Sequence, residues 1–205
     1  MLPARGWIVA LRVLPLIACL CTPAAATDIG WVARINGAPT RERTGTSAPL
    51  HQNDAVVTDD VIVTDGASKA KVLLADDSVL DIGTNTRVIL SEFRLQSDQR
   101  TARLQVVAGR FKLAIAKFFG GPSDYEVRTP TAVVGVRGTV LWGDTDLDTI
   151  CALDGTITVR SLTGTKEMAR LSGGHCARRM AAGKATPFMP SPTNLASYLR
   201  AVTLQ

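Results

Sequence analysis

Short β-branched segments separated by turn residues are the feature that most constrains the fold of this chain. Val61–Thr64, Lys69–Leu74 and Val79–Ile82 follow one another closely, with Asp, Gly, Ser and Asn between them. Segments of this length, at this spacing and between such residues, are typical of strands in an all-β protein. The pattern continues through most of the chain, so we expect an all-β fold.

The turns form a loose internal repeat. Asp65-Gly66, Asp77-Ser78 and Asp154-Gly155 each precede a strand with alternating polar and apolar residues. Asp-Gly favours the type I′ turns of hairpins, and Ala108-Gly109 predicts a further hairpin between two alternating segments. Stacked turn–strand units suit a β-roll, a solenoid-like stack or a two-sheet sandwich. The period is too irregular to choose between these architectures.

The C-terminal region differs in character from about Ala185 onward. Residues 185–205 are expected to form a linker, Thr186–Pro190, and then a short helix. Ser191 is a good N-cap, and Pro192 suits the first helical position. Because the apolar side chains over Asn194–Val202 recur at helical spacing, we expect the helix to pack on its own domain.

The N-terminus has the parts of a secretory signal peptide over residues 1–26. Basic residues precede a short apolar run, Val13–Cys21, and Ala24-Ala25-Ala26 ends it. We expect export to the periplasm and cleavage after Ala26. The alternative is a lipoprotein anchored through Cys19, because Leu16–Cys19 resembles a lipobox; the short apolar stretch that would remain disfavours it. No segment is long and apolar enough to span a bilayer, which takes about 20 residues.

The charge pattern limits the kinds of partner that this chain could bind, and its cysteines bear on the compartment in which it works. Removing residues 1–26 leaves 23 − 2 = 21 basic and 18 acidic residues, a net charge of +3. The basic residues form no stripe with aromatics between them, which argues against nucleic acid as a partner. Two cysteines remain, Cys151 and Cys176, and in an oxidising compartment we expect them to form a structural disulfide.

The residues that could carry catalysis or bind a metal do not form a recognised motif. His51 and His175 are far apart, so no His-based metal motif is present. Asp144–Asp148 begins like a calcium loop but lacks the later Gly and Glu, and is expected to be a turn. The acid pairs Asp59-Asp60 and Asp76-Asp77 are also expected in turns, where Asp side chains bond to nearby backbone. We therefore expect no catalytic residue, cofactor or metal, and no enzyme.

The run Thr129–Thr139 is an apolar segment interrupted by Pro130, Gly135 and Gly138, with Arg137 as its one charge. It predicts two strand pieces with a fixed backbone between them. An inward-facing Arg137 would have to be paired. We therefore favour a structural Arg that ties turn carbonyls and a carboxylate together over one that recognises an anionic ligand.

The loop from Phe118 to Pro122 holds two adjacent phenylalanines, Phe118 and Phe119, beside two glycines. It is either folded onto an edge of the core, the more common outcome, or an exposed contact site.

At these residues the chain resembles the FecR domain family. The resemblance rests on Thr129–Thr139, with Thr129, Pro130, Gly135, Arg137, Gly138 and Thr139 as the motif residues, and on the shorter segments Asp77–Gly83 and Asp154–Val159. It covers about residues 35–160, within an expected domain of residues 27–184. The resemblance implies a β-rich, non-enzymatic domain outside the cytoplasm. Founding members join it to a cytoplasmic anti-sigma segment through a membrane helix, whereas a stand-alone secreted form is expected here.

These observations predict a periplasmic interaction module that binds another envelope protein, through a sheet edge or the Phe118-Phe119 loop. The alternative is a module that binds glycan or peptidoglycan. That alternative requires exposed aromatics on a concave face, for which the candidates are Trp31, Tyr125, Trp142 and Tyr198. Aromatic residues make up only 5% of the chain, which weakens it.

Overall fold

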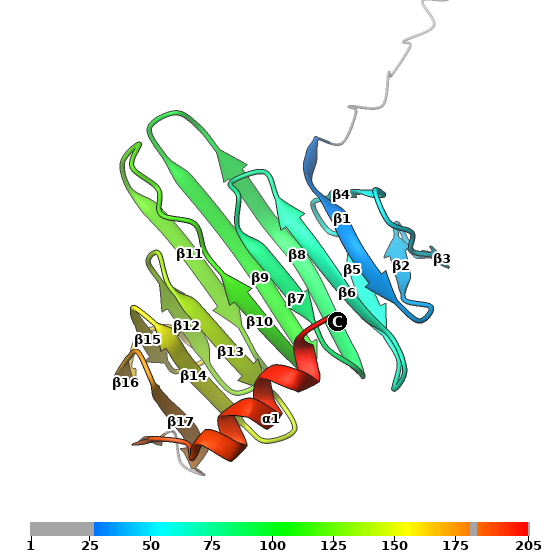
Figure 1. The fold of residues 1–205 in the computed structure, drawn as a ribbon. Helices are drawn as coiled ribbons and strands as arrows, with labels where there is room; N and C mark the ends of the chain where they lie inside the picture. Colours follow the sequence, from blue (N-terminus) through cyan, green and yellow to red (C-terminus); the bar gives the residue numbers. More distant parts are fainter. Residues whose placement is uncertain (1–26, 181–183, 205) are drawn as a thin grey trace, which may run out of the picture.

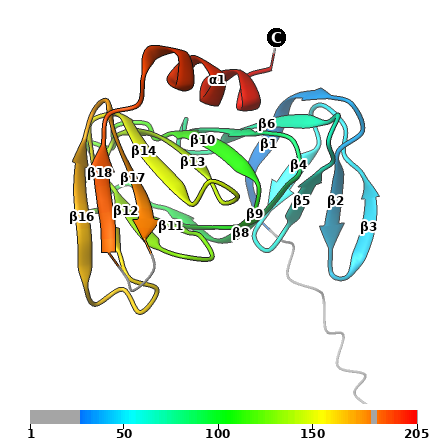
Figure 2. The same ribbon diagram turned by 90° about the horizontal axis from the view of Figure 1, so that it is seen from below.

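Two nine-stranded sheets pack face to face in the computed structural model, which describes residues 27–180 and 184–204 (Figures 1 and 2). In spatial order, the first sheet consists of β18 (Lys184–Phe188), β17 (His175–Met180), β14 (Thr149–Asp154), β13 (Val140–Asp144), β10 (Arg110–Ala114), β7 (Val79–Ile82), β6 (Lys69–Leu74), β1 (Asp28–Asn36) and β4 (Ala55–Val57). The second consists of β16 (Glu167–Ser172), β15 (Thr156–Arg160), β12 (Val133–Val136), β11 (Ser123–Arg128), β9 (Arg100–Ala108), β8 (Thr86–Leu95), β5 (Val61–Thr64), β2 (Thr40–Arg43) and β3 (Thr46–Pro49). Of the expected architectures, the chain has the two-sheet sandwich.

The chain passes repeatedly from one sheet to the other. It places one or two strands in the first sheet, the next one or two in the second, and then returns. Neighbouring strands are antiparallel except β9 and β11, which are parallel. The expected all-β fold is confirmed, with the strands β5, β6 and β7 at the predicted residues.

Several turns that were expected to close hairpins carry the chain between the sheets instead. Asp77-Ser78 does join the paired strands β6 and β7. Asp65-Gly66 and Asp154-Gly155, in contrast, connect strands of different sheets, and so does Gly109 between β9 and β10. The hairpin prediction at Ala108-Gly109 is therefore wrong. A turn residue with positive φ, such as Gly109 at +91°, permits a sharp reversal but does not select the strand that the chain pairs with next.

The core lies between the sheets and follows the alternation of each strand. In β6, for example, Ala70, Val72 and Leu74 are buried while the residues between them are half exposed. The largest apolar side chains of this core include Phe111, Leu80, Ile82, Leu113 and Leu141. Because side chains alternate across a strand, one face of every central strand contributes to this core.

The helix α1 (Pro192–Val202) lies on the outer face of the first sheet (Figure 2). The Ser191 hydroxyl accepts a hydrogen bond from the Asn194 amide at 3.2 Å, as expected of an N-cap. Tyr198 stacks on Trp142 with ring centroids 4.3 Å apart. The helix therefore packs on its own domain, as predicted.

The disulfide between Cys151 and Cys176 is confirmed; it joins the neighbouring strands β14 and β17. It is buried in a small apolar cluster with Trp142 and with Val202 of α1. Phe188 packs against this cluster from β18, so Lys184–Phe188 is a strand where the sequence predicts a linker. Among the described residues, no helix has the length and apolar character needed to cross a membrane. The expected signal peptide, residues 1–26, lies outside the described residues.

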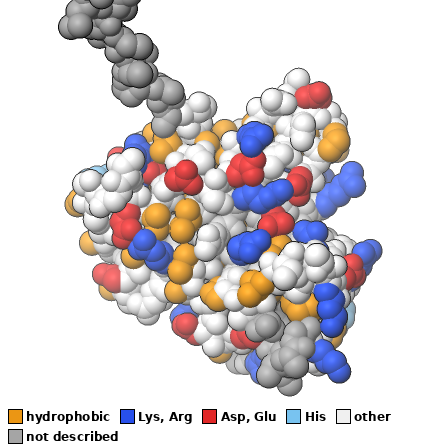
Figure 3. Space-filling view, turned by 180° about the vertical axis from the view of Figure 1, so that it is seen from behind, with side chains coloured by type: hydrophobic (Ala, Val, Ile, Leu, Met, Phe, Trp, Pro, Cys, Tyr) orange, Lys and Arg blue, Asp and Glu red, His pale blue; other side chains and the backbone are white. Residues whose placement is uncertain are grey.

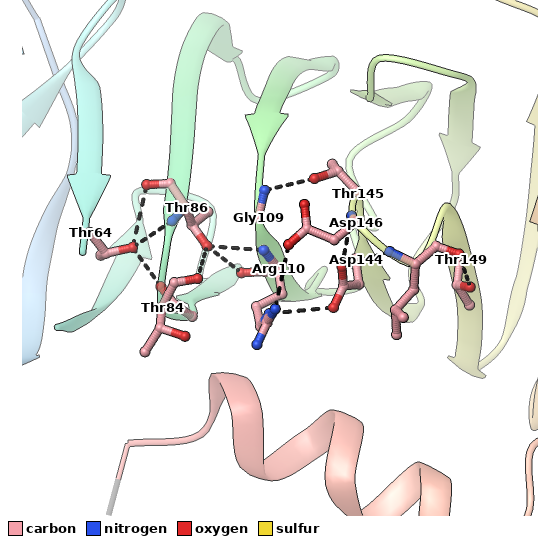
Figure 4. A network of polar contacts seen from close by, with 11 residues as sticks. Thr64, Thr84, Thr86, Gly109, Arg110, Asp144, Thr145, Asp146 and Thr149 are labelled. Atoms are coloured by element: carbon pink, nitrogen blue, oxygen red, sulfur yellow. Dashed lines mark hydrogen bonds and ion pairs between the residues drawn. The ribbon is translucent and has the colours of Figure 1, made fainter. Parts of the chain in front are cut away.

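A network of hydroxyls and charges closes the end of the sandwich that lies beside α1 (Figure 4). The Thr86 hydroxyl donates to the Arg110 carbonyl at 3.1 Å and accepts from the Arg110 amide at 2.9 Å. Asp144 accepts from the amides of residues 146 and 147 and lies 3.3 Å from the Arg110 guanidinium. Because Thr86 and Arg110 belong to different sheets, this network joins the sheets. Asp144–Asp148 is the turn between β13 and β14, as expected.

Candidate binding site

A buried arginine organises the opposite end of the sandwich. Arg100, at the start of β9, is 1% exposed, and its Nη1 donates to Asp76 Oδ2 at 2.8 Å and to the Ala116 carbonyl at 2.9 Å. Its Nε and Nη2 donate to the Ser123 hydroxyl at 3.0 and 2.8 Å. A buried charge is tolerated only when it is paired and hydrogen-bonded, and this one is. It thereby ties the β6–β7 turn, the segment after β10 and the start of β11 together.

Two aromatic rings enclose the same guanidinium. Its Cζ atom lies 5.3 Å from the ring centroid of Phe118 and 5.4 Å from that of Tyr125, within the range of a cation–π contact. Tyr125 is itself buried in the core. Burial, together with the nearby Asp76 charge, raises the pKa of Tyr125 above its ordinary value, so the phenol stays neutral. Phe118 thus covers the charge of Arg100 from the outside, as a loop folded onto the core edge would.

A pocket of about 290 Å³ lies against this cluster. Its lining comprises Arg100, Lys117, Phe118, Phe119, Ser123, Arg137 and Gly138. The pocket brings together the Phe118-Phe119 loop and the end of the Thr129–Thr139 run, which sequence reasoning treats as separate features. Phe119 is 91% exposed at its edge, so this second phenylalanine is not packed onto the core.

The backbone explains why Lys117 and Arg137 meet in this pocket. β10 and β13 are antiparallel, with Ala114 opposite Val140, and the Ile115 amide donates to the Thr139 carbonyl at 2.9 Å beyond the last paired residues. Gly138, the residue after Arg137, lies beside Lys117, because a Cβ at Gly138 would be 3.6 Å from Lys117 Cγ. Both side chains are exposed, and neither forms a hydrogen bond or ion pair with any residue that the structure describes.

A second pocket, of about 560 Å³, adjoins the first at Arg137 and lies on the outer face of the second sheet. Gly135 makes room there, because a Cβ at this position would lie 3.0 Å from Nη2 of Arg160. Arg160 pairs with Glu126 at 3.5 Å. Basic and acidic side chains are interspersed on this face, as Figure 3 shows.

The residues of the Thr129–Thr139 run lie in and around the strand β12, and most of them are buried or shape its turns. The Thr129 hydroxyl accepts from the amides of residues 131 and 132, which shapes the turn before β12. Pro130 is in that turn, Gly138 adopts φ +59°, and Thr139 is buried. Arg137 is the exception: its side chain is exposed, so the prediction of an Arg that ties turn carbonyls and a carboxylate together is wrong.

Arg100 has the role that sequence reasoning gave to Arg137. The burial of Arg100 follows the alternation of β9, in which every second residue from position 100 to position 106 is buried. Arg100 shares the parity of Ala102, Leu104 and Val106 and therefore faces inward with them. The cluster of polar residues just before it obscures this alternation, because it is typical of an exposed turn.

Most of the other candidate residues are buried or paired within the fold. Asp60 and Asp76 are buried; Asp60 accepts from Arg43 at 2.7 Å, and Asp76 accepts from Ser78 as well as Arg100. Tyr125 and Trp142 are also buried, and Trp31, at 44% exposure, lies on a different sheet from Tyr125. No group of three acidic, His or Cys side chains with metal-site geometry exists within residues 27–180 and 184–204. A concave aromatic surface for glycan is therefore not formed by the candidate residues.

Comparison with known proteins gives one family match and two structural neighbours. A family model described as FecR protein matches residues 60–173, more than half of the chain. No curated protein matches the sequence. Two crystal structures of a candidate anti-sigma factor from Parabacteroides distasonis ATCC 8503 share the fold, with TM-scores of 0.53 and 0.51 and identities of 17% and 18%. The matches cover 68% and 67% of this chain but 64% and 62% of the solved chains, which is less than two thirds of each.

Proposed function

This chain belongs to the FecR protein family, and from that premise we propose that it is a non-catalytic interaction module that binds another protein of the bacterial cell envelope, in signalling or envelope assembly. One observation carries the proposal: Phe119 projects into solvent, 91% exposed, beside a pocket that also holds Arg137. Aromatic residues and arginine are the types enriched where proteins bind one another. An exposed ring on a loop held by a buried cluster is suited to such contacts.

The state of the acidic residues supports a non-catalytic role. General acid–base chemistry needs carboxyl groups that face a substrate. Asp60 and Asp76 are instead engaged by Arg43, Arg100 and Ser78 in the interior. Their neighbours Asp59 and Asp77 have positive φ, at 67° and 64°, in tight turns.

We place this function in the periplasm, after export and cleavage following Ala26. The order of basic, apolar and small residues before Thr27 supports export. The Cys151–Cys176 disulfide supports an oxidising compartment, because such bonds persist there and are rare in the cytosol.

A photocrosslinking amino acid at position 119 tests the proposal in the native envelope. The full chain is expressed with benzoyl-phenylalanine in place of Phe119, irradiated, and its adducts are identified by mass spectrometry. The matched control carries the same group in place of Trp31, which is 44% exposed on the other sheet. A protein adduct from position 119 that position 31 does not give is the expected result. Adducts to glycan fragments alone, or the same adducts from both positions, would overturn the proposal.

A further inference from the structure

The pocket between Phe119 and Arg137 has a positive charge that no acidic residue of its lining balances. We propose that it binds a carboxylate of an acidic, extended peptide segment in the partner. This inference rests on the proposed function and specifies the chemistry of what the module recognises. The carboxylate would be held between Lys117 and Arg137, with the Phe118-Phe119 loop against the neighbouring side chain of the segment.

The lining of the pocket is positively charged. Three of its residues are cationic, Arg100, Lys117 and Arg137, and none is acidic. Asp76 compensates Arg100 at 2.8 Å, and Phe118 covers it. Lys117 and Arg137 remain, exposed on adjacent chain segments that a backbone hydrogen bond holds together.

Lys117 and Arg137 differ from two basic residues on the nearby outer face of the second sheet. On the outer face of the second sheet, Arg87 pairs with Glu42 at 2.6 Å, and Arg103 pairs with Asp124. Lys117 and Arg137 line one pocket that has no acidic lining residue, and neither pairs with an acidic side chain among the described residues. An external carboxylate would therefore have two cations available to it. A guanidinium also matches a carboxylate through two parallel hydrogen bonds.

The phenylalanines at the pocket favour a peptide over a simple anion as the ligand. The pocket is walled by Phe118 and bordered by the exposed ring of Phe119, which an inorganic anion would not use. A peptide with acidic and apolar residues at alternate positions presents both a carboxylate and a side chain for the ring. Its apolar contact and its ion pair would then be made at the same place.

Binding of a defined probe tests this inference. A fluorescent peptide with Glu and Leu at alternate positions is titrated with the exported chain, and its anisotropy is measured at low and at high salt. Arg137→Glu and Lys117→Glu are each expected to weaken binding at least about tenfold, as charge pairs at interfaces do. Arg34→Glu is the matched control, because Arg34 is exposed, on β1, and makes no ion pair with the described residues. Thermal midpoints are recorded to show that every variant is folded.

The outcomes separate this inference from the proposed function. Weakening by both pocket variants but not by Arg34→Glu supports it, as does loss of affinity in high salt. Equal effects of all three variants would overturn it, as would complete displacement of the probe by inorganic phosphate at an ionic strength at which sodium chloride leaves the probe bound. If position 119 still crosslinks to a protein partner in that case, the proposed function stands and only the acidic segment is refuted. If the peptide binds as expected but position 119 gives no protein adduct, the proposed function is the part that fails.

Discussion

At the scale of single residues, the two arginines at one end of the sandwich differ in what surrounds them. Arg100 uses Nε, Nη1 and Nη2 on partners from three segments and lies between two aromatic rings. Arg137, in the adjoining turn, is exposed and free of such partners within the described chain. Removing either member of a buried ion pair leaves the remaining charge buried and uncompensated. We therefore assign stability to Arg100 and recognition to Arg137.

Replacing each arginine by methionine separates these roles. Arg100→Met leaves Asp76 buried without its cation and is expected to lower the free energy of unfolding by about 3–5 kcal/mol. Arg137→Met removes an exposed charge and is expected to change it by less than about 0.5 kcal/mol. Urea denaturation measures both. Equal losses would show that Arg137 also stabilises the fold, contrary to its exposure.

At the scale of elements, the crossover from β9 to β10 depends on a backbone conformation that favours glycine. Gly109 has φ +91°, and an added Cβ would collide with the Asn85 carbonyl oxygen and the Thr86 hydroxyl. Thr86 is also the residue whose hydroxyl joins the sheets through Arg110. The turn after β9 is therefore packed against the polar network of Figure 4, so its conformation and that network depend on each other.

Gly109→Ala is expected to destabilise the protein more than Gly45→Ala. Both glycines have positive φ, at 91° and 79°, so both variants incur the cost of a left-handed conformation, about 1–2 kcal/mol. Only Gly109 has atoms in the way, since nothing lies within 4 Å of a Cβ at Gly45. The difference between the two midpoints of thermal unfolding isolates the steric part. Indistinguishable midpoints would show that the crossover relaxes around a methyl group.

At the scale of the whole molecule, the two ends of the sandwich differ in their residues and interactions. One end is closed by the Thr86–Arg110–Asp144 network beside α1. The helix packs on the outer face of the first sheet, over the cluster that contains the disulfide. The other end holds Arg100 and the pocket with Phe119. Each end contains an ion pair with a buried carboxylate, Arg110 with Asp144 and Arg100 with Asp76, but only the second end combines an exposed ring with two exposed cations that pair with no described residue. Contact with a partner is therefore expected there.

The mature protein is expected to begin at Thr27. Cleavage after Ala26 follows from the small residues at positions 24 to 26, and intact mass of the protein purified from its native host measures it. Non-reducing conditions should keep the mass two hydrogens below that of the reduced chain, because of the Cys151–Cys176 bond. A lipid-modified product beginning at Cys19 would contradict the assignment.

Local patterns in the sequence were sufficient for most of the strands and for the helix cap, although β18 was predicted as a linker. Alternation defines a strand because side chains point to opposite faces, and Ser191-Pro192 begins a helix because both residues suit its first turn. The motif at Thr129–Thr139 was likewise enough to indicate the family that the model match then showed. The pairing of strands was not predictable, since Asp-Gly turns serve hairpins and crossovers alike.

The sequence by itself determined the fold class, the short C-terminal helix and the family of this protein, because each depends on residues that are neighbours along the chain. Only the tertiary structure decided which arginine is buried and which residues share the pocket. Arg100, Lys117 and Arg137 are charged residues in polar or punctuated stretches, and the polar residues before Arg100 obscure the strand alternation that it shares with Ala102, Leu104 and Val106. Their difference arises from the register that sets β10 against β13 and from the loops that enclose Arg100. Contacts between distant segments, rather than any local motif, create the candidate site.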